Sequence, residues 1–198
     1  MPNIQNCTVT FKIIRRRLSK DEFLKIARNG ANVELNTRRF HSIIMRLRYA
    51  GRTVACLIFQ SGRVVLTGVR KPSFAKIVAH RVLRRIQHAY NHATNKAEKF
   101  SLINLRVVNI VCSHTFPHRI PIVHLLPVLH IRKEFFSVRY DPTIFPALRC
   151  KLSLTDNDVH ATCIVYHSGK AIITGLASVE HINKAFSLLS SFITDNIE

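Results

Sequence analysis

The side chains of this chain that could do binding chemistry occur twice, in two copies of one twelve-residue segment. The first copy runs from Leu57 to Gly68 and the second from Ile164 to Gly175. In both copies two apolar residues and an aromatic residue precede Ser-Gly and a cation, and Thr-Gly closes the segment. A repeat of this length indicates one structural unit built twice, and therefore a pseudo-twofold molecule. Duplex nucleic acid is the commonest partner that has a twofold axis of its own.

Catalytic chemistry is disfavoured by what the sequence lacks. It shows no nucleophile–base pair, carboxylate dyad, glycine-rich phosphate loop or metal-binding cluster, and it holds only six glycines and eleven acidic residues. The five cysteines include no C-x-x-C pair, which disfavours disulfides and a structural zinc. The spacing of His114, His118, His124 and His130 fits neither a zinc finger nor a metalloprotease. We therefore predict no enzymatic activity, no metal and no cofactor.

The charge of the chain points to a polyanionic partner. Its formal net charge is +19 and its isoelectric point is near 10.7. Such a balance favours nucleic acid first and an anionic membrane surface second. No segment approaches the roughly 20 apolar residues of a membrane span. The N-terminus also lacks the pattern of a signal peptide, so we predict no membrane insertion.

The duplication extends over the whole chain and predicts two units. The segment around Asn6 matches the segment around Asn109, with the two asparagines in register. A polar linker at 91–99 separates the copies. We place the first repeat at 1–99 and the second at 100–198, intertwined in one molecule.

Each unit reads as strand, helix, several strands and a closing helix, which is an α+β pattern. Ser19 and Glu22 form a capping box at the start of the first helix. Pro117, Pro121 and Pro127 predict that the matching helix of the second unit is short or irregular. The expected strands of the first unit lie at 40–48, 54–60 and 63–69. The closing helices should bury two apolar stripes, formed by Phe74, Ile77, Val78, Val82 and Ile86, and by Ile182, Phe186, Leu189 and Ile193.

One feature departs from the usual pattern of a half-buried strand. In Leu57-Ile58-Phe59, and again around Val65, the strand is apolar on both faces, with Leu57 and Phe59 on the face opposite Cys56. Two helices per unit can cover only one face of an antiparallel sheet, so an apolar face is left to be covered. The cover could be a second protein, a second sheet or the floor of a DNA minor groove. The same face predicts a possible homodimer when DNA is absent.

A set of motifs now matches a known pattern, in order and in both halves. The motifs are Gln5-Asn6, Arg39-Phe40, Ile44-Met45-Arg46-Leu47-Arg48, Leu57-Ile58-Phe59-x-Ser61-Gly62, Leu66-Thr67-Gly68, Val108-Asn109, Tyr140-Asp141-Pro142 with Phe145-Pro146, and Ser168-Gly169-Lys170 with Thr174-Gly175. With them the chain resembles the TATA-box-binding protein family along nearly its full length. The resemblance implies an α+β pseudo-twofold saddle of two tandem repeats, with a curved antiparallel sheet of about ten strands and four helices on the convex side.

The resemblance also implies a function. Family members are nuclear transcription initiation factors that bind and bend A·T-rich promoter DNA through the minor groove. They assemble with transcription factors IIA and IIB. This family is itself the reference case for minor-groove binding by apolar wedges, so that mechanism is carried over by resemblance.

The site residues implied by the resemblance fall into four groups. The polar residues that meet base edges are Asn6, Thr8, Thr67, Asn109 and Thr174. The apolar floor consists of Leu57, Val65, Val111, Ile164 and Ile172. The wedge aromatics are Phe40 with Phe59, and Phe145 with Tyr166. The phosphate-contacting cations are Arg39, Arg46, Arg48, Arg63, Lys151 and Lys170.

Departures from the family pattern leave a second function open. Tyr166 stands in place of a phenylalanine, Thr8 in place of a valine, and Thr143 in place of an acidic residue in the loop that meets transcription factor IIB. Tyr140 and Asp141 remain in that loop. The closing helix of the first unit is basic on its outer face, where Arg81, Arg84 and Arg85 are expected to meet an acidic partner protein or DNA that flanks the site. The alternative is a scaffold with weak or altered DNA specificity that acts mainly through transcription-factor partners.

Overall fold

The computed structural model describes residues 1–36, 41–94, 98–154 and 159–197, and it divides the chain into two compact units. One unit is Asn6–Val108, called the N-unit below. The other combines Met1–Gln5 with Asn109–Glu198 and is called the C-unit. The boundaries expected for the two repeats, 1–99 and 100–198, stay a prediction.

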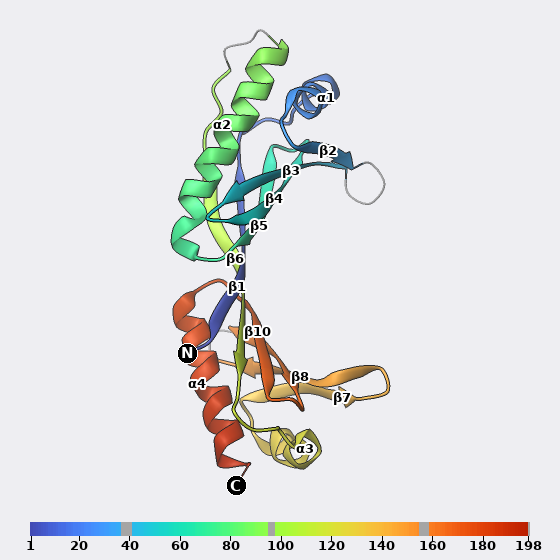
Figure 1. The fold of residues 1–198 in the computed structure, drawn as a ribbon, viewed down its shortest axis with the longest axis vertical. Helices are drawn as coiled ribbons and strands as arrows, with labels where there is room; N and C mark the ends of the chain where they lie inside the picture. Colours follow the sequence, from blue (N-terminus) through green and yellow to red (C-terminus); the bar gives the residue numbers. More distant parts are fainter. Residues whose placement is uncertain (37–40, 95–97, 155–158, 198) are drawn as a thin grey trace. The chain divides into compact units, whose positions relative to one another are not determined.

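The two units repeat one order of elements (Figure 1). The first copy consists of β1 (Asn3–Lys12), α1 (Lys20–Asn29), β2 (Val33–Asn36), β3 (Ser42–Tyr49), β4 (Arg52–Phe59), β5 (Arg63–Val69), the 3-10 turn η1 (Pro72–Phe74) and α2 (Ala75–Thr94). The second consists of β6 (Ile103–Thr115), α3 (Ile122–Ile131), β7 (Phe135–Asp141), β8 (Phe145–Ser153), β9 (His160–Tyr166), β10 (Lys170–Leu176) and α4 (Val179–Asp195). Over the described residues this amounts to ten strands and four α-helices, as the α+β prediction requires. None of these helices has the length and apolar character needed to span a membrane.

The strands of each unit form an antiparallel array with the same order. In the N-unit the order is β2-β3-β4-β5-β1, and in the C-unit it is β7-β8-β9-β10-β6. The closing helix of each repeat packs on the last strand of that repeat, α2 on β5 and α4 on β10. The helices therefore cover one face of each array, and we call the other face the open face.

Alternation along the strands decides which residues reach the open face. In β4, Val54, Cys56 and Ile58 are at most 1% exposed, whereas Leu57 and Phe59 between and after them are half-buried. This is the parity that the sequence predicted. Cys56 is one of five cysteines that are all buried and free of disulfides. The strand β4 therefore places one apolar face in the core and leaves its other apolar face partly exposed.

Three expectations about the helices need correction. Ile77 is 49% exposed, because the buried side of α2 follows Val78, Val82 and Ile86 at helical spacing and Ile77 lies beside that stripe. The polar linker begins later than expected, since α2 continues to Thr94. The first helix of the second repeat is not short: α3 has ten residues, like α1, although it contains Pro127.

A partly buried ionic network lies at the start of α1 in the N-unit. Ser19 and Glu22 form the predicted capping box, and the Arg16 guanidinium donates 2.8 and 2.9 Å hydrogen bonds to Glu22. Arg16 also pairs with Glu98, which follows α2. The hydroxyl of the fully buried Tyr90 lies 2.9 Å from an oxygen of each carboxylate. The network therefore connects the segment after β1, both helices and the segment that leads into the second repeat.

The ionic network predicts a pH-dependent stability. Hydrogen bonds from Arg16 hold the pKa of Glu22 well below its ordinary value of 4.5. A carboxyl with a depressed pKa in the folded state stabilises the protein above its ordinary pKa and loses that contribution as the pH falls. Glu22→Gln should therefore flatten the loss of unfolding free energy below about pH 4.5, measured by chemical denaturation across pH.

A second variant tests the tyrosine. Tyr90→Phe should lower the free energy of unfolding by about 1.5–3 kcal/mol at neutral pH, because it removes a buried hydrogen bond to charged groups. Lys25→Gln is the matched control, since its ion pair with Asp21 lies on the surface and such pairs contribute about 0–1 kcal/mol. Equal effects of Tyr90→Phe and Lys25→Gln would show that the network does not stabilise the fold.

Candidate nucleic-acid interface

An asparagine in the N-unit is held in one orientation by its neighbours on β5. The Asn6 side-chain amide donates to Thr67 Oγ1 over 3.0 Å, and the backbone N–H of Gly68 donates to Asn6 Oδ1 over 2.6 Å. A backbone N–H can only donate, so it fixes which end of the amide carries oxygen. Gly68 has φ +95°, and a Cβ there would lie 2.7 Å from the carbonyl oxygen of Thr53. Only glycine fits this position.

The C-unit repeats the same arrangement with its own residues. Asn109 donates to Thr174 Oγ1 over 3.1 Å and accepts the backbone N–H of Gly175 over 2.8 Å. An amide nitrogen carries two protons, and only one of them is used by the threonine. We call each set an Asn-Thr-Gly clamp. Each clamp orients a half-buried amide donor, and the two clamps match one another across the repeats.

Apolar side chains surround each clamp on the open face. In the N-unit Leu57 pairs with Val65, and in the C-unit Ile164 pairs with Ile172. These four side chains are half-buried, as are Thr8 on β1 and Val111 on β6. The structure therefore brings the predicted floor residues of each unit together in neighbouring strands. Each open face has few polar groups, and the clamp supplies oriented ones.

The structure describes three of the four predicted wedge aromatics, namely Phe59, Phe145 and Tyr166. In the C-unit the rings of Phe145 and Tyr166 lie 6.2 Å apart, measured between their centroids. In the N-unit Phe59 ends β4 opposite Ser42 and is half-buried. Phe40, its expected partner, lies outside the described residues, as does Arg39.

The predicted phosphate contacts are surface cations. The five that the structure describes, all exposed, are Arg46, Arg48, Arg63, Lys151 and Lys170. Arg46 forms a 3.1 Å ion pair with Glu34, and both side chains are at least half exposed. An exposed pair of this kind is weak, so it does not keep Arg46 from another anion.

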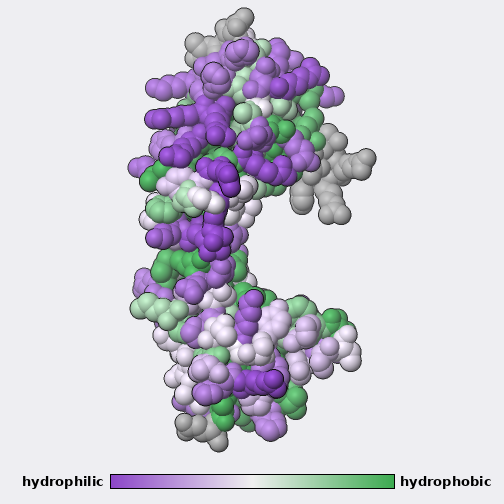
Figure 2. Space-filling model, in the orientation of Figure 1, coloured by the Kyte–Doolittle hydropathy of each residue, from purple (hydrophilic) through white to green (hydrophobic). Residues whose placement is uncertain are grey.

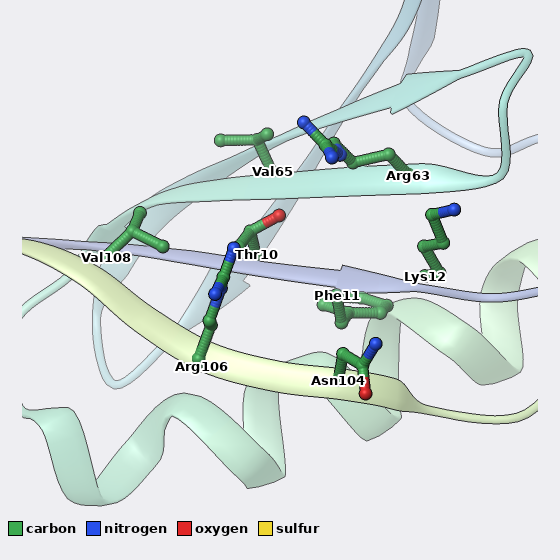
Figure 3. A pocket seen from close by; sticks show the side chains of 8 residues that line it. All are labelled: Thr10, Phe11, Lys12, Arg63, Val65, Asn104, Arg106 and Val108. Atoms are coloured by element: carbon green, nitrogen blue, oxygen red, sulfur yellow. The ribbon is translucent and has the colours of Figure 1, made fainter.

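A cationic depression on the N-unit was not predicted from the sequence. It has a volume of about 380 Å³ and lies among β5, β1 and the first part of β6. Figure 3 shows Arg106 extending from β6 toward Thr10 on β1, with Arg63 and Lys12 nearby. The full lining is Thr10, Phe11, Lys12, Arg63, Val65, Asn104, Arg106 and Val108, without a carboxylate. Three cations around a hollow next to floor residue Val65 fit a phosphate group.

Sequence reasoning missed Lys12 and Arg106 for a simple reason. The repeat match around Asn109 began at Val108, whereas β6 begins five residues earlier, at Ile103. The signal was present in the alternation of Asn104, Arg106 and Val108, which are exposed at every second position. A strand assigned to its full length would have placed Arg106 beside β1.

The predicted partner-binding residues lie at two separate places. In the β7–β8 hairpin Tyr140 is half-buried and Asp141 is exposed. Thr143 donates its backbone N–H and its hydroxyl to Asp141, and these bonds lower the pKa of that carboxyl. On α2, Arg84 and Arg85 are exposed.

The third basic residue of this group, Arg81, is also exposed. Its guanidinium lies 5.0 Å from the centre of the Tyr49 ring.

Within the described part of the chain, no three His, Cys, Asp or Glu side chains come together as a metal site would need.

Two tandem α+β repeats with matching polar clamps on apolar open faces define a class of internally duplicated sheet proteins, and comparison with known proteins identifies the family. The family model described as transcription factor TFIID (or TATA-binding protein, TBP) matches residues 1–89 and 104–195. The chain therefore belongs to the TATA-binding protein family. This is a family of non-enzymatic DNA-binding transcription factors.

Individual relatives agree with this assignment. The chain is 31% identical over 198 residues to TATA box-binding protein-like 2 of Mus musculus, with 97% of this chain and 50% of that protein covered. It is 30% identical to TATA-box-binding protein of Dictyostelium discoideum, with 97% and 85% covered. The chain thus spans about half the length of the mouse relative.

A solved structure has the same fold. Methanococcus jannaschii TBP matches with a TM-score of 0.71 at 23% sequence identity, and the match covers 98% of both chains. The expected fold, two tandem TBP-type repeats with ten strands and four helices, is confirmed.

The cationic depression predicts a salt effect. Arg106→Gln and Lys12→Gln should each reduce the slope of log affinity for duplex DNA against log salt concentration by about 1, because each phosphate contact releases condensed counterions. Fluorescence anisotropy at several salt concentrations measures this slope. Arg28→Gln, which removes the same charge from exposed α1, is the control and should leave the slope nearly unchanged. Identical slopes for all three variants would contradict a phosphate site at the depression.

Proposed function

We propose that this protein binds A·T-rich promoter DNA through the minor groove, bends it, and seeds assembly of a transcription initiation complex in the nucleus. The observation that carries the proposal is the pair of Asn-Thr-Gly clamps on two apolar open faces. At its edges the minor groove offers adenine N3 and thymine O2 as acceptors, and a G·C pair adds the guanine amine as a donor. A partner selective for A·T pairs needs few donors and much apolar contact.

The clamps supply those few donors. The free amide proton of Asn6, and that of Asn109, can be donated to a base acceptor without any loss of the bonds that orient the side chain. A guanine amine opposite such a donor, or pressed against Val65 or Ile172, would lose its hydrogen bond to water. Selection against G·C pairs follows from that lost hydrogen bond.

The aromatic residues supply the bending. Insertion of an apolar wedge at a base step costs about a few kcal/mol of unstacking, which is offset by the larger surface that a bent duplex contacts. Phe145 and Tyr166 lie close enough to act as one wedge, and Phe59 occupies the matching place in the N-unit. The Tyr166 hydroxyl must find a partner at the groove edge, so we expect the two wedges to differ in strength.

Substitution of the wedges tests the proposal. Phe59→Ala and Phe145→Ala should each abolish most of the bending of an A·T-rich duplex labelled at both ends, measured by energy transfer at fixed salt. Affinity should fall by about tenfold or more, since a straight duplex touches less of the protein than a bent one. Leu188→Ala on α4 and Ile77→Ala on α2 are partly exposed apolar controls away from the open faces, and both should bend DNA normally.

The same titration separates the two functions. A clear preference of the unmodified protein for A·T-rich over G·C-rich duplexes supports the initiation factor. No preference, with normal bending by the wedge variants, would leave the alternative of a scaffold with weak or altered DNA specificity.

The helix α2 gives that alternative its specific support. Its outer face is basic, with Arg84 and Arg85 exposed, and Figure 2 shows hydrophilic side chains gathered over this part of the N-unit. We propose that this face and the β7–β8 hairpin, with Tyr140 and Asp141, bind initiation factors related to transcription factors IIA and IIB. The open apolar faces also favour a homodimer when DNA is absent.

Charge reversal tests the helical surface. Arg84→Glu combined with Arg85→Glu should abolish binding to an acidic initiation factor of the IIA type and leave the affinity for an A·T-rich duplex within about twofold, since like charges across an interface repel strongly. Lys184→Glu on α4 is the control. Loss of DNA binding in the double variant would place α2 at the DNA rather than at a protein partner.

A further inference from the structure

The two open faces differ at the outer end of their matching cross-strand rows. Cross-strand pairing gives Ile44–Leu57–Val65–Thr10 as a row of the N-unit and Arg149–Ile164–Ile172–Ser113 as the matching row of the C-unit. Three of the four matched pairs have similar side chains. At the outer end of the row an isoleucine of β3 is replaced by an arginine of β8.

Arg149 is a cation held against a wedge ring. Its side chain is exposed, and its guanidinium carbon lies 4.8 Å from the centre of the Phe145 ring. That ring in turn lies 6.2 Å from Tyr166. Opposite Arg149 on β7 stands another cation, Arg139, and among the described residues no carboxylate pairs with Arg149. The charge is therefore positioned by an aromatic face, and no carboxylate of the described residues neutralises it.

Neighbouring positions on the outer strands show the same trend. Ala55, which pairs with Thr67, is matched by Thr162, which pairs with Thr174. Phe59 is matched by Tyr166. Both changes add a hydrogen-bond donor to the C-unit.

On the inner strands β1 and β6 the extra hydrogen-bond donor belongs to the N-unit instead, because Thr8 of β1 is matched by Val111 of β6. The added donors of the C-unit are thus concentrated on β8 and β9, around the wedge.

Isoleucine and arginine select bases by different chemistry. Ile44 offers only apolar contact, which a protruding guanine amine disrupts. A guanidinium offers five N–H donors at the end of a long side chain, and purine N3 and pyrimidine O2 are acceptors in every base pair. Its charge is also attracted to the negative potential of a narrow minor groove. Arg149 can therefore retain its contacts at a G·C pair where Ile44 loses them.

We propose that Arg149 is a specificity-determining residue that makes the C-unit tolerate a G·C pair in its half of the site, whereas the N-unit requires A·T. This inference rests on the proposed function, because it concerns the same minor-groove site. A difference in tolerance between the halves gives an asymmetric site one preferred orientation. Arg149, one of several positions at which the two repeats differ, would then give the protein a direction on DNA.

The repeat-matched substitution Arg149→Ile provides the test. Three duplexes are compared by fluorescence anisotropy: one all A·T, and two with a single G·C pair in one half or the other. The protein should bind a duplex with one G·C pair nearly as well as the all-A·T duplex, and Arg149→Ile should raise the penalty for that pair about tenfold, the usual discrimination by one base contact. In Ile44→Arg both units should tolerate the pair, so this variant should lose the preferred orientation.

Orientation is measured with a dye at one site. All five cysteines are buried, so Ser187→Cys on the surface of α4 accepts a single fluorophore. Energy transfer to one end of the asymmetric duplex should show that the protein places its C-unit at the G·C half. Arg149→Ile should lose this preference, whereas Arg139→Ile, which removes the same charge from β7, should keep it.

The outcomes distinguish the two proposals. If the unmodified protein shows no preference for A·T over G·C duplexes, the proposed function fails. If it prefers A·T but Arg149→Ile keeps the same penalty and the same orientation, the role of Arg149 is overturned. Arg149→Gln, which keeps a polar side chain without charge, gives a second variant should the isoleucine variant unfold, and unchanged penalty and orientation in it would count equally against the inference.

Discussion

The structure depends on one constraint: helices cover only one face of each antiparallel array. Every residue of the candidate interface follows from the alternation that this imposes. Cys56 and Ile58 go into the core, and Leu57 and Phe59 remain half-buried on the other side. Exposure of an apolar face to water has a free-energy cost. The presence of such a face in both units therefore argues for a partner that covers it.

Within that face, the Asn-Thr-Gly clamps convert a bulge in the sheet into a binding element. The register between β1 and β5 shifts between Cys7 and Val9, and the positive φ of Gly68 turns its N–H toward Asn6. The amide is thereby fixed before any partner arrives, which lowers the entropy that binding must overcome. Asn109 forms the same arrangement in the C-unit, so each repeat carries one such binding element.

Much of this could be predicted from the sequence because it depends on local patterns. The capping box at Ser19, the alternation at Leu57 and the repeated Thr-Gly pairs that close the two copies all follow from spacing alone. Arg149 and Arg106 could not be recognised in this way, because their roles depend on which strands lie beside them. The ten-residue length of α3 despite Pro127 depends likewise on packing, since its own side chains Ile122, Leu125 and Leu129 are buried. Register and tertiary burial are the information that single-sequence patterns lack.

The division of the chain into units has a consequence for each repeat taken by itself. The N-unit extends through Val108 and so includes the first part of β6, while the C-unit takes up Met1–Gln5 from the start of β1. Neither compact unit is made of one sequence repeat alone. Either repeat taken alone would therefore lack a strand segment that its compact unit takes from the other repeat.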